Sequence, residues 1–135
     1  MIHFDTAFFI DLADEVARER PGGAFELIES LDEREILTVS VHVVCELRVG
    51  AELGRNALKE QERVDDMLHG FHVVYPNDRF APLFGRLRAE VIRNNRTVND
   101  LDLLIATAAL LDDAPVVTRN VKDFSRVPGL RVLGY

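Results

Sequence analysis

The stretch NDLDLLIATAALL, residues 99–111, places two aspartates directly before an uncharged run. Asp100 and Asp102 stand at its start, and the nine residues after Asp102 carry no charge. A run this apolar predicts a helix that packs into the interior of a folded domain. The two carboxylates before it have two explanations, a helix cap or a site for a metal ion.

Helical geometry separates the two aspartates. Each residue of a helix advances by about 100°, so Asp100 and Asp102 face opposite ways. We assign Asp100 to the cap or the first turn, where a negative charge complements the helix dipole. Asp102 shares a face with Ile105, Ala106 and Ala109, and this face leads into the protein. Asp102 is therefore the better candidate for a functional carboxylate.

Apolar strands alternate with helices along the rest of the chain. Helices are expected at residues 6–20, 24–33, 41–54 (capped by Ser40 and ended by Gly54), 56–70, 78–95 and 99–111. Strands are expected at residues 1–4, 36–40, 71–76, 114–120 and 130–135. Because the strands are continuously apolar, the pattern predicts an α/β layered domain on a mostly parallel sheet of four to five strands.

Composition and charge narrow the class of protein. The chain has 135 residues, 47% of them hydrophobic, and a net charge of −7, which argues against holding nucleic acid through bulk positive charge. The longest uncharged run falls short of the about 20 residues that span a bilayer, and the first residues lack the features of a signal peptide. The single cysteine, Cys45, is expected to be a small buried side chain, consistent with a reducing cytoplasm.

Polar side chains follow several of the expected strands. In parallel α/β sheets, functional groups gather outside the carboxyl ends of the strands. Asp5 directly follows the first strand, and Glu46 lies in the helix after the second. Thr118 ends the fourth strand, and Asn120 and Asp123 follow it.

Each of these residues also has a structural explanation. Asp5 is suited to cap the following helix, a role that Thr6 can share. Glu46 is suited to an ion pair with Arg48 or with an arginine elsewhere. After the fourth strand, Asn120 or Asp123 is suited to cap a short helix.

Taken together, the acids indicate a cation site. Carboxylates that converge repel one another unless a cation neutralises them. The donors are all oxygens, which favours Mg²⁺ or Mn²⁺, and none of the four histidines (His3, His42, His69, His72) shows the spacing of a zinc site. Such ions are the usual equipment for hydrolysis of phosphodiesters, and a metal ion would hold a scissile phosphate despite the acidic surface.

Four segments in order resemble the successive motifs of PIN-domain ribonucleases, and more narrowly those of the VapC toxins of VapBC toxin–antitoxin modules. They are HFDTAFFIDL (residues 3–12), SVHVVCELRVGA (40–51), VNDLDLLIATAALL (98–111) and PVVTRNVKDFSRVPGL (115–130). The resemblance covers nearly the whole chain. It implies a single PIN domain over residues 1–135 with a three-layer α/β/α fold.

The resemblance also implies roles for individual residues. Asp5, Glu46 and Asp102 would hold Mg²⁺, with Mn²⁺ as a substitute, and Asp123 would join them in catalysis. Accessory roles fall on Thr6, Asp100, Thr118 and Asn120.

Two positions depart from the pattern of the family. Ala7 stands where members commonly have asparagine, and the neutral Asn120 stands at the position of the fourth acid. We therefore expect one firmly held Mg²⁺ and a weaker or substrate-recruited second ion.

The implied function is metal-dependent cleavage of cellular RNA (tRNA, rRNA or mRNA) in the cytoplasm. Arg119 and Lys122 flank the site and are candidates for contacts with RNA phosphates, with solvated surface charge as the alternative. The implied partners are a cognate VapB-like antitoxin, whose basic residue would enter the acidic groove, and a second copy of the chain packed through the early helices. DNA would be met only through the antitoxin.

Three other functions would make different demands on the same residues. A phosphoryl-transfer enzyme with Asp5 as its nucleophile would need an acid two residues on, where Ala7 stands. A signalling receiver domain would need an acid pair after the first strand. A catalytically silent binding module, whose acids cap helices and bind a basic peptide, stays open because Asn120 is neutral.

Overall fold

A five-stranded sheet forms the centre of the computed structural model, which describes residues 1–135. The strands lie in the order β3-β2-β1-β4-β5, and each neighbouring pair is parallel. Their carboxyl ends therefore share one edge of the sheet, and the predicted mostly parallel sheet is confirmed. The strands are β1 (Ile2–Phe4), β2 (Leu37–Ser40), β3 (His72–Val74), β4 (Val116–Val117) and β5 (Val132–Leu133).

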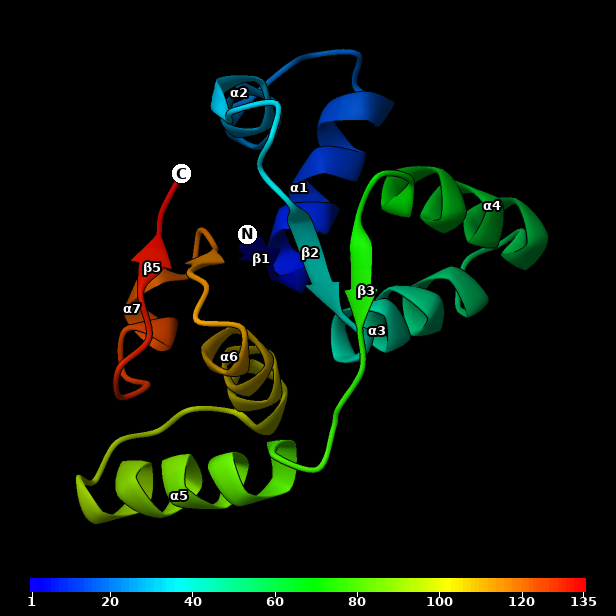
Figure 1. Cartoon of the computed structure of the whole chain (residues 1–135). Coiled ribbons are helices and arrows are strands. Elements are labelled where there is room, and N and C mark those ends of the chain that lie inside the picture. The colour runs from blue at the N-terminus through cyan, green and yellow to red at the C-terminus, as the bar shows by residue number, and fades with distance from the viewer.

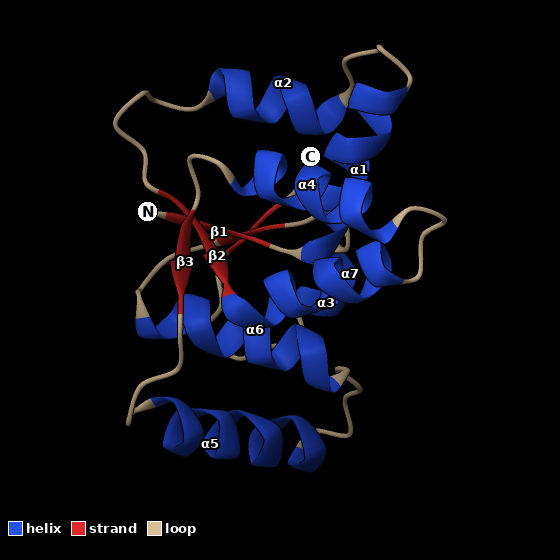
Figure 2. Ribbon diagram, turned by 90° about the vertical axis from the view of Figure 1, so that its right-hand side faces the viewer, coloured by secondary structure: helices blue, strands red, loops and turns tan.

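Helices cover both faces of the sheet. Figure 2 shows α1 and α2 on one side of the strands and α6 on the other, and Figure 1 shows α5 beyond α6. Helix α3 packs against α4 and also contacts α1 and α6. This arrangement confirms the predicted three-layer α/β/α fold. The helices are α1 (Thr6–Ala17), α2 (Gly23–Ser30), α3 (Val41–Glu52), α4 (Ala57–Leu68), α5 (Phe80–Arg93), α6 (Asp100–Leu111) and α7 (Val121–Phe124).

Helix α6 is buried between the sheet and α5, which explains its uncharged sequence. An ordinary surface helix is apolar on one face only, whereas a helix covered on both sides is apolar all round. Its buried residues are Leu103, Ile105, Ala106, Thr107, Ala108 and Ala109. Of the seven helices, none combines the length and the apolarity that crossing a membrane requires.

Helix α3 departs from expectation in three local features. It ends at Glu52, with Leu53 rather than Gly54 in the C-cap position, and the Ser40 hydroxyl makes no capping hydrogen bond. The expectation that Cys45 is buried is wrong, because the side chain is exposed. The buried face of α3 carries Val43 and Leu47, and Cys45 lies two residues from each, on the opposite face.

Candidate functional site

Asp5 lies at the carboxyl end of β1 and caps α1. Its Oδ1 accepts a hydrogen bond from the Phe8 amide (2.9 Å), and its Oδ2 accepts one from the Thr118 hydroxyl (2.5 Å). Only 2% of the residue is exposed. Burial raises the pKa of Asp5, and the two hydrogen bonds act against that rise. Asp5 is therefore both the expected helix cap and a buried carboxylate at the predicted edge of the sheet.

Glu46 projects from the middle of α3 toward the start of α1. The Thr6 hydroxyl donates a hydrogen bond of 2.6 Å to its Oε2. The alternative of an ion pair between Glu46 and Arg48 is wrong, because Arg48 pairs with Asp65 of α4 at 2.6 Å. Glu46 forms no salt bridge, so it stays available at the surface.

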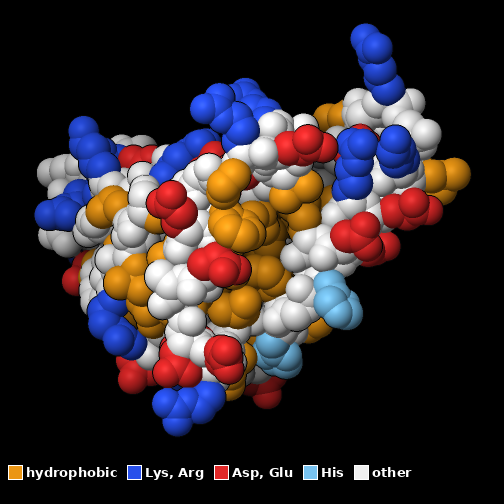
Figure 3. Space-filling view, turned by 90° about the horizontal axis from the view of Figure 1, so that it is seen from above, with side chains coloured by type: hydrophobic (Ala, Val, Ile, Leu, Met, Phe, Trp, Pro, Cys, Tyr) orange, Lys and Arg blue, Asp and Glu red, His pale blue; other side chains and the backbone are white.

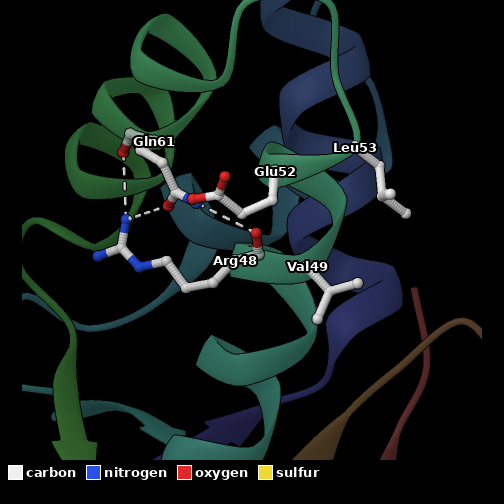
Figure 4. A pocket seen from close by; sticks show the side chains of 5 residues that line it. All are labelled: Arg48, Val49, Glu52, Leu53 and Gln61. Atoms are coloured by element: carbon white, nitrogen blue, oxygen red, sulfur yellow. Dashed lines mark hydrogen bonds between the residues drawn. The ribbon is translucent and has the colours of Figure 1, made fainter.

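Arg48 belongs to a separate polar cluster on α3 and α4. Its Nη1 donates to Gln61 Oε1 (2.9 Å), and Gln61 Nε2 donates to Glu52 Oε1 (3.0 Å). With Val49 and Leu53, these side chains line a pocket between the two helices (Figure 4). No candidate site residue lines this pocket, so it is separate from the carboxylates.

Asp102 lies in the first turn of α6, where Asn99 fixes it. Asn99 Oδ1 accepts from the Asp102 amide (2.8 Å), and Asn99 Nδ2 donates to Asp102 Oδ2 (2.9 Å). Burial and the charge of Asp5, with smaller effects from Asp123 and Glu46, raise the pKa of Asp102 to about 6. The charges of carboxylates from three other segments of the chain therefore act on Asp102.

Asp100 faces away from this group. It accepts a hydrogen bond from Arg88 of α5 (2.6 Å), and 84% of its side chain is exposed. Arg88 also donates to the Val98 carbonyl (2.8 Å), so the pair joins α5 to the start of α6. The charge of Asp100 is not among the causes of the raised pKa of Asp102. The two aspartates therefore face apart, as the helical geometry predicts.

The turn after β4 brings further predicted residues to the site. Thr118 is fully buried and, besides donating to Asp5, accepts from the Asn120 amide (2.9 Å). Asn120 is exposed, at the N-cap position of α7, without a side-chain capping bond. Asp123 is half-exposed and lies 3.5 Å from Arg126, yet it still acts on Asp102.

Three residues that sequence reasoning missed complete the surroundings. Asn99 had a readable signal, since asparagine directly before a helix is a preferred N-cap. Asp11 of α1 pairs with Arg119 and accepts a hydrogen bond from Tyr135 (2.7 Å). Neither Asp11 nor Tyr135 had such a signal, because their contact joins residues far apart in the chain.

The carboxylate oxygens are suitable ligands for a hard cation, but they do not form a complete coordination site. No group of three or more acidic, histidine or cysteine side chains is placed to hold one ion directly. Glu46 accepts a hydrogen bond from Thr6, Asp102 accepts one from Asn99 and Asp5 accepts two, so all three carboxylates receive neutral donors only. Each carboxylate oxygen has a second lone pair, so these contacts leave acceptor capacity for an ion or its water ligands.

Comparison with known proteins identifies the family. A family model described as PIN domain matches residues 2–130, and the chain therefore belongs to the PIN domain family. The chain is 27% identical over 112 residues to ribonuclease VapC2 of Rickettsia felis, covering 83% of this chain and 84% of that protein. It is 29% identical over 96 residues to the tRNA(fMet)-specific endonuclease VapC of Salmonella typhimurium, covering 71% and 73% of the two chains.

A solved structure agrees with this assignment. VapBC-1 from nontypeable Haemophilus influenzae superposes with a TM-score of 0.86 and 27% identity, over 99% of this chain and 98% of that one. The likeness to PIN-domain ribonucleases and to VapC proteins, inferred from the motifs, is confirmed.

Proposed function

We propose that this protein is a metal-dependent endoribonuclease that acts as the toxin of a VapBC-type module. The observation that carries the proposal is the buried Asp5 at the carboxyl end of β1, hydrogen-bonded to Thr118 after β4, with the charges of Asp5, Asp123 and Glu46 raising the pKa of Asp102. A divalent cation relieves such repulsion. Membership of the PIN domain family and likeness to proteins named as VapC ribonucleases support the activity.

In this proposal, Asp5, Glu46 and Asp102 hold Mg²⁺ or Mn²⁺, directly or through water, and Asp123 contributes further negative charge. When bound, such an ion would supply a water of lowered pKa and stabilise the charge that develops on the phosphate. Because Asn120 is neutral, one ion is held firmly and a second only weakly.

Each of the three ligands has its own positioning donor. Thr118 holds Asp5, Thr6 holds Glu46, and Asn99 holds Asp102. Such donors fix the direction of a ligand before the cation arrives, which improves affinity and geometry. The accessory roles predicted for Thr6 and Thr118 agree with these contacts.

The proposed substrate is RNA. Arg119 and Lys122 are exposed in the segment that follows β4, next to Thr118, and we assign them contacts with RNA phosphates. One relative, that of Salmonella typhimurium, is named for its action on tRNA(fMet), which makes tRNA the first substrate to test. The protein would act in the cytoplasm.

The proposed partners are an antitoxin and a second copy of the chain. A basic segment of the antitoxin would enter the acidic site, for the same electrostatic reason that a cation does. Figure 3 shows apolar side chains gathered over α1 and α2, where Ile10, Val16 and Phe25 are exposed. We assign this apolar surface to the homodimer, and contact with DNA to the antitoxin alone.

Cleavage of tRNA by the purified protein tests the proposal. We expect cleavage in millimolar Mg²⁺, loss of cleavage with a chelator, and loss with Asp5→Asn, which removes the charge and keeps the size of the side chain. Asp100→Asn serves as a control of the same chemistry on a residue turned away from the site. Cleavage that survives both the chelator and Asp5→Asn would contradict the metal mechanism.

The lack of a complete coordination site favours a second candidate, the silent binding module that holds a basic peptide. Millimolar Mg²⁺ separates the two functions in the absence of RNA. It should raise the melting temperature of the nuclease and leave that of a binding module unchanged.

A further inference from the structure

Three side chains form a polar cluster beside the carboxylates. Asp11 of α1 accepts a hydrogen bond from Arg119 at its Oδ1 and one of 2.7 Å from the Tyr135 hydroxyl at its Oδ2. The cluster joins a helix on one face of the sheet, the turn that follows β4 and the segment after β5. Both oxygens of Asp11 are thereby engaged, and the site described above uses neither Asp11 nor Tyr135.

Tyr135 is held firmly on α1. Its ring packs edge-on against Phe8, with centroids 5.7 Å apart and planes at 85°. Phe8 and Asp11 are three residues apart and so lie on one face of the helix. A Cβ at Gly23 would approach the Tyr135 ring to 3.3 Å, so the start of α2 closes in on the same ring. The hydroxyl is therefore a fixed donor to Asp11.

Arg119 is the only cation whose charge lowers the pKa of Asp5. It directly follows Thr118, whose hydroxyl bonds to Asp5, and its long side chain is half-exposed. Guanidinium groups bind carboxylates strongly, and four carboxylates lie in this region. An unrestrained Arg119 would therefore compete with a metal ion for Asp5.

We propose that Asp11, fixed by Tyr135, holds the Arg119 guanidinium away from Asp5 and so keeps that carboxylate accessible to a divalent cation. Asp11 and Tyr135 are then positioning residues, which act through Arg119. The inference rests on the proposed function, because it concerns access to the same cation site.

Titration calorimetry with Mn²⁺ alone, on chelator-treated full-length protein, tests this inference without RNA. Asp11→Ala should weaken Mn²⁺ binding by about tenfold or more, the size expected for displacing one charge-assisted hydrogen bond. Asp11→Asn, which keeps the shape, should lie between Asp11→Ala and the native protein. Tyr135→Phe should weaken binding by a smaller factor, because Asp11 keeps its charge.

The decisive comparison is a second substitution in the same chain. Arg119→Ala added to Asp11→Ala should restore native Mn²⁺ affinity or better it, because no guanidinium is left to compete. Asp65→Asn is the matched control, since it breaks the Arg48–Asp65 pair on α3 and α4 and should leave Mn²⁺ binding unchanged. Circular dichroism establishes that each variant is folded.

The outcomes distinguish failure of the proposed function from failure of the positioning role of Asp11. If the native protein binds no Mn²⁺, the proposed function fails and this inference fails with it. If the native protein binds Mn²⁺ and Asp11→Ala binds it equally well, only this inference is overturned. If the double variant binds as weakly as Asp11→Ala, Asp11 is itself a ligand, and the positioning role is refuted.

Discussion

Replacing Asp102 by asparagine should stabilise the metal-free protein at neutral pH. In the folded protein the pKa of Asp102 rises from its ordinary value of 3.8 to about 6, chiefly through burial and the charge of Asp5. Each tenfold change in proton affinity corresponds to about 1.4 kcal/mol, so ionised Asp102 costs the fold at most about 3 kcal/mol. Solvent screening at this partly exposed side chain brings the cost to about 2 kcal/mol.

One opposing effect has to be subtracted. Asp102 lies in the first turn of α6, where its charge gains about 0.3–1 kcal/mol from the helix dipole. The asparagine variant loses this gain, although it keeps the acceptor to Asn99. The expected net stabilisation is therefore about 1–2 kcal/mol at pH 7.5. Asp100→Asn is the matched control, because it loses the same dipole interaction and its Arg88 contact without relieving any crowding.

Urea denaturation in a chelator measures both variants against the native protein. Because the pKa of Asp102 is raised on folding, the native protein recovers stability as the pH falls through about 6. The advantage of Asp102→Asn should therefore shrink between pH 7.5 and pH 4. An advantage that persists at pH 4, or none at pH 7.5, would refute the electrostatic argument. Saturating Mg²⁺ should stabilise the native protein, so that its free energy of unfolding exceeds that of Asp102→Asn.

Two further substitutions test the supports of the site, and a third tests a buried histidine of β1. Thr118→Val leaves Oδ2 of the buried Asp5 without a donor and should lower the free energy of unfolding by about 1–3 kcal/mol, measured by urea denaturation. Asn99→Ala removes the cap of α6 and should cost about 1 kcal/mol, and NMR titration should show a further rise in the pKa of Asp102. Burial lowers the pKa of His3 from its ordinary value of 6.5, so the folded protein loses stability as the pH falls below 6.5 and His3 has to be protonated. His3→Gln should flatten this fall in the free energy of unfolding, measured by urea denaturation across the pH range.

The sequence predicted the elements because their patterns are local. Continuous apolar strands and the uncharged helix after Asp102 specify a covered parallel sheet. Once the strands are parallel, residues at their carboxyl ends must lie at one edge of the sheet. This rule selected both Asp5 and Thr118, which are hydrogen-bonded although they lie 113 residues apart in the chain. Asp100 and Asp102 were separated by helical geometry alone.

The partners of individual side chains were not predictable, because tertiary packing selects them. Glu46 is bonded to Thr6 of α1 rather than to its neighbour Arg48, which the packing of α4 against α3 gives to Asp65. Cys45 was assigned to the interior from its apolar neighbours, although α3 turns it outward. The contact between Asp11 and Tyr135 depends on where the chain returns after β5.

The most direct measurement of the central claim is a titration of the chelator-treated protein with Mn²⁺, followed by electron paramagnetic resonance at pH 7.5. Convergence of the three acids predicts one firmly bound ion in the native protein, with binding strongly weakened in Asp5→Asn and in Asp102→Asn. Binding that is absent from the native protein, or equal in the native protein and both variants, would contradict the account.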